Sequence, residues 1–205
     1  MILTPYQLDA LREMINIGVG RAAGILNAML RSHIILRLPE VGVLSKAEVE
    51  AKAIQYGPEV FAAVRLGFRG PFAGNASLVF PEDSAAKLVV LLTEGEAGLS
   101  DDNDLDSIRI GTLTEVGNIV LNSVMGAIGN ELKQHIFYSV PTFQEESLRK
   151  MLAGSTPDAD SNVVWVQTQF SVEDHQIDGD IILVFEMGSL DLLLNAVNRQ
   201  LQAEL

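Results

Sequence analysis

Apolar residues recur at the spacing of an α-helix near the start of the chain and again in its second half. They are Leu8, Leu11, Ile15, Val19, Ala22, Leu26 and Leu30 in the first stretch, and Leu113, Gly117, Leu121, Val124 and Ile128 in the second. This pattern predicts two long amphipathic helices, each with one buried side. The first is expected to begin with a capping box, because Thr4 is followed by Pro5 and then by Gln7.

Short apolar runs bounded by Gly, Pro and Asp predict about three strands after each long helix. They are Ile34–Leu38, Val60–Phe68 and Ala76–Phe80 in the first half, and Ile136–Val140, Val163–Val172 and Ile181–Phe185 in the second. A shorter helix is expected to follow each set of strands. Trp165 lies within the second-half strands and is expected to pack on the core.

Several landmarks return in the same order in the second half of the chain. Glu13, Asn16, His33 and Pro39 return as Glu115, Asn118, His135 and Pro141, each 102 residues later. The segment Gly74–Phe80 returns as Gly179–Phe185, after a slip of three residues. Such an ordered recurrence predicts a duplicated unit of about 100 residues.

The predicted fold class is α+β. A pseudo-twofold duplicated helix–three-strand–helix unit is expected to form one largely antiparallel sheet, with the long helices packed on it. We expect a single domain over residues 1–205, made of two repeats at about 1–97 and 104–205. The segment 94–106, rich in Gly, Asp and Ser, is the expected linker, with Asp106 or Ser107 capping the next helix.

Composition narrows the function classes. The 205 residues include no cysteine, which excludes disulfides and thiolate metal sites, and the formal net charge is −13. That charge argues against nucleic acids and anionic membrane surfaces as partners. The sequence shows neither a signal-peptide pattern nor an apolar run of about 18 residues, so we expect a cytoplasmic protein without a membrane span.

Polar residues form a second, narrower stripe on each long helix, turned about 120° from the apolar centre. The stripe comprises Asp9, Glu13, Asn16 and Gly20 on the first helix, and Glu115, Asn118 and Asn122 on the second. Each pairs a carboxylate acceptor with an amide that both donates and accepts hydrogen bonds. Nothing in the sequence suggests a nucleophile–base pair, so such a stripe is suited to completing the active site of another protein.

These stripes resemble the motif of the CheC–CheX–FliY family of chemotaxis phosphatases. The family motif has Asp or Ser, then Glu four residues on, Asn three further, and Pro after twenty-two intervening residues. The first copy matches fully at Asp9, Glu13, Asn16 and Pro39, and the second matches at Glu115, Asn118 and Pro141, with Gly111 in the place of Asp or Ser. Two copies of the motif are expected of the CheC-type members of this family.

The resemblance implies a phosphatase for a CheY-type response regulator phosphorylated on aspartate. Asn16 and Asn118 would each orient the attacking water, and Glu13 and Glu115 would each dock to a lysine of the regulator. Asp9, Gly20 and Asn122 are the expected docking positions around them. The enzyme would bind no cofactor of its own, since Mg²⁺ belongs to the regulator, and the deamidase CheD is a further candidate partner. The alternative is a non-catalytic adaptor that binds the phosphorylated regulator or CheD.

Other signals favour ordinary structural roles. Gly18-Val-Gly20-Arg-Ala-Ala-Gly24 resembles a dinucleotide fingerprint but lies inside a predicted helix, which favours close packing. Residues 102–106 resemble the start of a calcium loop but lack its Gly and Glu. His33 and His135 have no ligand partner at metal spacing and are expected at strand entries.

The segment Glu145–Leu152 is expected to be a short amphipathic surface stretch, with docking of CheD as the functional alternative.

The two stripes are not equal in sequence. Gly111 removes a polar group from the second stripe, and Asn122 either obstructs the approach of the regulator or adds a hydrogen bond. We expect both sites to work, with the first contributing at least as much as the second.

Overall fold

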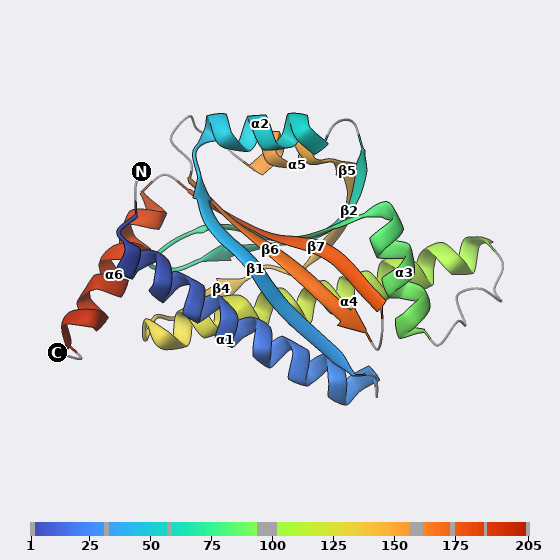
Figure 1. The fold of residues 1–205 in the computed structure, drawn as a ribbon, viewed down its shortest axis with the longest axis horizontal. Helices are drawn as coiled ribbons and strands as arrows, with labels where there is room; N and C mark the ends of the chain where they lie inside the picture. Colours follow the sequence, from blue (N-terminus) through green and yellow to red (C-terminus); the bar gives the residue numbers. More distant parts are fainter. Residues whose placement is uncertain are drawn as a thin grey trace.

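The computed structural model describes most of the chain. The described residues are 3–30, 33–56, 59–93, 102–155, 162–172, 175–186 and 188–203. The elements are α1 (Pro5–Leu30), β1 (Ile34–Leu44), α2 (Lys46–Tyr56), β2 (Val60–Arg69), β3 (Gly74–Pro81), α3 (Glu82–Leu92), α4 (Asp102–Glu131), β4 (Phe137–Tyr138), β5 (Thr142–Ser147), α5 (Leu148–Ser155), β6 (Asn162–Val172), β7 (His175–Phe185) and α6 (Ser189–Ala203). Each half begins with a long helix and ends with a strand pair and a shorter helix (Figure 1).

The strands form one seven-stranded antiparallel sheet. Its order is β1-β6-β7-β3-β2-β4, and β5 also pairs with β2. Exchanging the halves, so that β1 replaces β5, β6 replaces β2 and β7 replaces β3, leaves this order unchanged. The predicted fold class, an antiparallel sheet with pseudo-twofold symmetry, is therefore confirmed. The linker at 94–106 lies largely outside the described residues, so the repeat boundaries stay a prediction.

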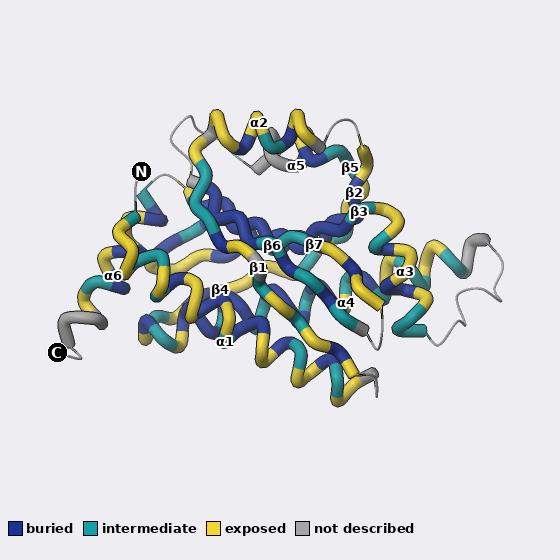
Figure 2. Tube along the Cα trace, in the orientation of Figure 1, coloured by how far each residue is buried: buried dark blue, intermediate teal, exposed yellow. Residues whose placement is uncertain are grey.

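Helices cover both faces of the sheet. One face carries the larger apolar core, to which α1, α3, α4 and α6 contribute, and the other carries a smaller core under α2 and α5. Figure 1 shows α2 and α5 on the side of the sheet opposite α1 and α4. Buried residues follow the sheet and the helix sides that face it (Figure 2). Trp165 is 3% exposed and belongs to the smaller core, which confirms its predicted packing.

The short helices α2 and α5 were not predicted as the cover of a second face. Helix α2 buries only Val49 and Ala53 among its described side chains, so its pattern is mostly polar. The prediction of one amphipathic stretch over Glu145–Leu152 was wrong. Its first three residues belong to β5, and α5 begins at Leu148, because the edge of β2 offers backbone partners to 142–147.

The strands predicted at 60–68, 76–80 and 163–172 lie within β2, β3 and β6, whereas β7 begins at His175, six residues before the strand predicted at 181–185. The first strand of each half differs more. The strand expected at Ile34–Leu38 continues to Leu44 through a register shift between Arg37 and Glu40. Pro39 lies at this shift, where a missing backbone N–H is tolerated. The strand expected at Ile136–Val140 is reduced to the two residues of β4, since the chain moves to β5 to pair with β2.

The start of α1 is fixed as predicted. The backbone N–H of Thr4 donates to Gln7 Oε1 at 2.9 Å, and the N–H of Gln7 donates to Thr4 Oγ1 at 3.3 Å. Helix α4 differs, because it begins at Asp102. The prediction that Asp106 or Ser107 caps it was therefore wrong, and both residues lie within the helix.

Candidate functional site

The stripe predicted on α1 lies on its solvent side. Asp9, Glu13, Asn16 and Gly20 are exposed, whereas the apolar positions Leu11, Ile15, Val19 and Ala22 are buried. Asp9 forms a long ion pair with Arg12, 3.7 Å from Oδ1 to Nη1. Within the described part of the chain, the side chain of Asn16 has no hydrogen-bond partner. The Glu–Asn pair of α1 is therefore presented to solvent.

The stripe on α4 has the same spacing of its Glu–Asn pair, is less exposed, and has one added contact. Glu115 and Gly111 are exposed, and Asn118 and Asn122 are partly buried. The side-chain amide of Asn122 donates from Nδ2 to Asn118 Oδ1 at 2.6 Å. The acceptor of this hydrogen bond is the neighbouring amide of the same stripe. Whether Asn122 obstructs the regulator or contacts it stays a prediction.

The two helices are held against each other and against the sheet by close contacts at glycine. A Cβ added at Gly18 of α1 would lie 2.4 Å from the Cα of Val124 in α4. A Cβ added at Gly117 of α4 would lie 2.5 Å from Val64 of β2. By contrast, a Cβ at Gly20 would meet no atom within 4 Å. Gly18 therefore has the predicted packing role, and Gly20 leaves open space beside Asn16.

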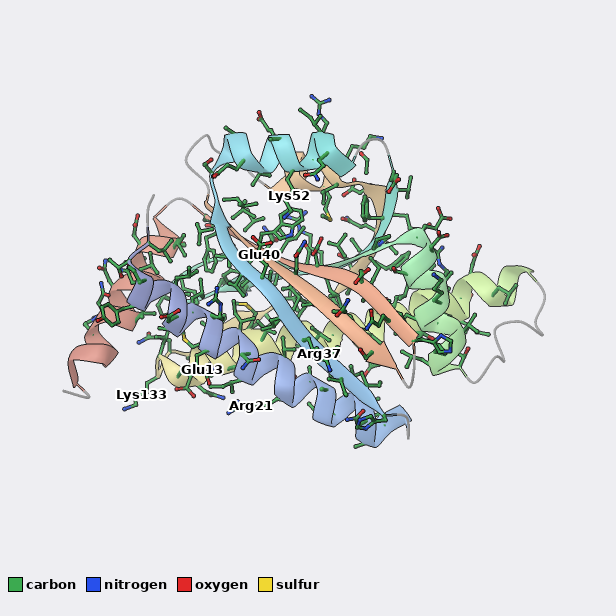
Figure 3. All side chains as sticks on the ribbon, viewed as in Figure 1. Glu13, Arg21, Arg37, Glu40, Lys52 and Lys133 are labelled. Atoms are coloured by element: carbon green, nitrogen blue, oxygen red, sulfur yellow. The ribbon has the colours of Figure 1, made fainter. Side chains whose placement is uncertain are left out.

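Figure 3 shows where Glu13 of the first stripe lies relative to the rest of the molecule. Glu13 and Arg21 lie on the α1–α4 side, whereas Lys52 lies beneath α2 on the other face. The Lys52 ammonium is 4.7 Å from the centre of the Trp165 ring, a cation–π contact of the smaller core. The predicted site residues thus gather on the α1–α4 layer, away from this cluster.

Two of the histidines lie at the entries of strands. His33 and His135 are exposed, one directly before β1 and the other shortly before β4, as predicted for strand entries. The His135 ring contacts Phe137 edge-on, with 4.8 Å between ring centroids. Among the described residues, no three His, Asp or Glu side chains are grouped to hold a metal ion.

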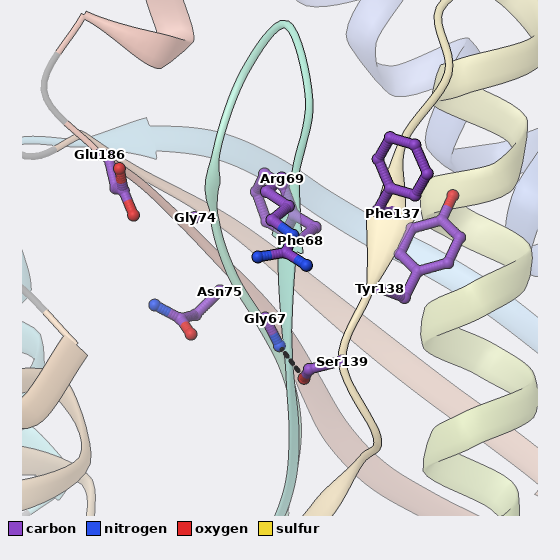
Figure 4. Close-up of a pocket in the computed structure, with 9 residues that line it drawn as sticks. All are labelled: Gly67, Phe68, Arg69, Gly74, Asn75, Phe137, Tyr138, Ser139 and Glu186. Carbon is purple, nitrogen blue, oxygen red and sulfur yellow. Dashed lines mark hydrogen bonds between the residues drawn. The ribbon is translucent and has the colours of Figure 1, made fainter.

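A pocket of about 370 Å³ lies where β2, β3 and β4 end (Figure 4). Its lining brings together the guanidinium group of Arg69, the carboxylate of Glu186 and the ring of Tyr138. The Ser139 hydroxyl accepts a hydrogen bond from the backbone N–H of Gly67 at 2.8 Å, and partial burial raises the pKa of Tyr138. Sequence analysis missed this pocket because its lining comes from four separate strand ends. It includes none of the stripe residues.

Neither long helix has the character of a membrane span. Within the described ranges, no helix combines the length and apolar content needed to cross a bilayer.

Comparison with known proteins finds relatives in sequence and in fold. No family model matches the sequence. The chain is 28% identical over 138 residues to the CheY-P phosphatase CheC of Bacillus subtilis. This match covers 66% of the chain and 64% of the length of that relative, so it spans less than two thirds of the curated protein.

Solved structures share the fold over nearly the whole chain. Thermotoga maritima FliY matches with a TM-score of 0.74 at 20% identity, covering 98% of this chain and 100% of FliY. A CheX from Borrelia burgdorferi, solved in complex with CheY, BeF3 and Mg²⁺, matches with a TM-score of 0.55 at 20% identity. That match covers 84% of this chain and 97% of the solved one.

Proposed function

We propose that this chain, a protein of the CheC–CheX–FliY type as its motifs predicted, accelerates hydrolysis of the aspartyl-phosphate of a CheY-type response regulator. The observation that carries the proposal is the presentation of two Glu–x–x–Asn pairs on the solvent sides of α1 and α4. Two further observations support it. The relative matched in sequence is described as a CheY-P phosphatase, and a solved structure of this fold is a complex with CheY.

The chemistry of the stripe suits a reaction that needs alignment more than covalent help. The amide of Asn16 or Asn118 accepts a hydrogen bond from a water and directs it in line with the phosphorus. The carboxylate of Glu13 or Glu115 pairs with a lysine of the regulator and fixes the docking. Mg²⁺ held by the regulator supplies the charge stabilisation, and the proposal assigns no metal to this chain.

The neighbouring positions adjust how the regulator docks. Asp9 adds a second carboxylate to the first stripe, and its ion pair with Arg12 is long and exposed, so Asp9 can exchange that partner at little cost. Gly20 leaves open space beside Asn16 for the backbone of the partner. Asn122 lies one helical turn beyond Asn118 and adds a polar surface there.

The test uses the CheY-type regulators of the organism, phosphorylated and mixed with the purified protein. Phosphate release should be faster than spontaneous hydrolysis, and the double variant Asn16→Ala/Asn118→Ala should lose about a hundredfold of that acceleration, the order expected when positioning fails. The fold should survive, since neither amide belongs to the buried core. Asn195→Ala, which removes an exposed amide from α6, is the matched control and should keep wild-type activity.

Three other outcomes would contradict the proposal. Near-wild-type acceleration by the folded double variant would show that these amides do not orient the water. Tight binding of the phosphorylated regulator without faster phosphate release would identify the protein as a non-catalytic adaptor. Binding of CheD without binding of the regulator would identify the protein as an adaptor for CheD.

A further inference from the structure

The amides of Asn118 and Asn122 are joined, whereas the corresponding amide of α1 stands alone. Nδ2 of Asn122 lies 2.6 Å from Oδ1 of Asn118, one helical turn away. In α1 the residue one helical turn after Asn16 is Gly20, which has no side chain and faces open space. The two proposed sites therefore differ in a specific hydrogen bond to the residue that would orient water.

This hydrogen bond constrains both the rotamer and the face of the Asn118 amide. A side-chain amide carries two donors on nitrogen and two lone pairs on oxygen. The donor from Asn122 occupies one lone pair of Oδ1, so the oxygen faces Asn122 and keeps one lone pair for a water. Partial burial of both side chains limits competition from bulk solvent.

We propose that Asn122 is a positioning residue that orients Asn118 before the regulator docks. The proposal rests on the proposed phosphatase function and assigns the second site a faster hydrolysis step once docking has occurred. Asn16 must lose side-chain conformational freedom as the transition state forms. Asn118 has already lost part of that freedom through its hydrogen bond with Asn122. Ordering one such side chain corresponds to about a threefold to tenfold change in rate.

A purely structural role makes a different prediction. A hydrogen bond between side chains one turn apart stabilises the helix that carries it. If that were its only function, loss of the bond would move the midpoint of unfolding and leave kcat per folded molecule unchanged. The two roles are separated by measuring kcat, KM and the unfolding midpoint on the same variants.

The first experiment isolates the second site in an Asn16→Ala background. Asn122→Ala should lower kcat for phosphate release by about threefold to tenfold, with KM within about twofold of the parent. Asn122→Asp should lower kcat at least as much as Asn122→Ala. A carboxylate cannot donate to Oδ1 of Asn118 and instead accepts from its Nδ2, which turns the Asn118 amide the other way. Asn122→Gln retains an amide donor and should lie closer to the parent.

The reciprocal experiment isolates the first site in an Asn118→Ala background. Gly20→Asn should raise kcat by about threefold, because it creates the same amide pair where there is room for it. Gly24→Asn is the matched control, since it adds the same amide at an exposed position of α1 with open space around it, about two turns from Asn16. Its kcat should equal that of the background.

The proposal is overturned if Asn122→Ala and Asn122→Asp leave kcat unchanged in folded protein. It is also overturned if KM rises while kcat does not fall, or if the Asn16→Ala protein shows no acceleration. These results differ from failure of the proposed function, in which the wild-type protein itself does not accelerate phosphate release.

Discussion

On α1 the Glu13–Asn16 pair is flanked by Asp9 and Gly20, whereas on α4 the Glu115–Asn118 pair is flanked by Gly111 and Asn122. The first stripe therefore has one more carboxylate for docking, and its amide lies in open space. The second has lost that carboxylate and has gained a hydrogen bond on its amide. Duplication has kept the pair in both helices while the residues around it have diverged.

A single site would have to meet two requirements, binding of the regulator and orientation of the amide. The difference between the stripes divides these requirements between two sites. Under the proposed function, charge on the first stripe would favour encounter and binding of the regulator, which appear in KM. Orientation of the amide on the second stripe would favour the step after binding, which appears in kcat. The sequence alone led us to expect the first site to contribute at least as much as the second. If Asn122 orients Asn118 as proposed, that expectation holds only at low concentrations of the regulator.

Separating α1 from α4 should have the largest effect, because both stripes depend on their fixed crossing. Gly18→Ala places a Cβ 2.4 Å from the Cα of Val124, so the helices must move apart. We expect a loss of about 1–3 kcal/mol in the free energy of unfolding, measured by urea titration. Gly20→Ala on the same helix has open space and should raise that free energy by up to about 1 kcal/mol. Equal stabilities for the two variants would contradict the close crossing at Gly18.

Reversing the docking charge should weaken binding at both stripes. The double variant Glu13→Lys/Glu115→Lys places like charge against the expected lysine and should raise the dissociation constant for the phosphorylated regulator about tenfold at low salt. The effect should shrink as ionic strength rises. Glu50→Lys/Glu82→Lys, with exposed carboxylates on α2 and α3, changes the net charge equally and is the control. An affinity that falls equally in both variants would indicate attraction by overall charge only.

The single variants Asn16→Ala and Asn118→Ala should differ by about threefold at saturating regulator, the smallest effect, since each retains one site. At limiting regulator Asn16→Ala should lose more than half of the activity, because the better-docking site is gone. At saturating regulator Asn118→Ala should lose more than half. The initial rate of phosphate release over a range of regulator concentrations measures both. Curves for the two variants that fail to cross would show that docking and orientation are not divided in this way.

The sequence by itself determined the long helices, their two stripes and the duplication. These features depend on the residue spacing within one segment, which fixes the face of a helix without reference to the rest of the chain. For the same reason the Glu13–Asn16 and Glu115–Asn118 pairs were found in advance, together with the capping box at Thr4.

Tertiary structure decided which parts of the molecule the segments pack against. Helix α2 and strand β5 were missed because a mostly polar helix becomes a cover, and a polar segment becomes a strand, only when a sheet face or edge is available to them. The rotamers that join Asn122 to Asn118 were likewise left open by the sequence, since the spacing allows the contact and does not require it. Packing also assigned different roles to Gly18 and Gly20, because a close approach of backbones depends on where the second helix crosses the first.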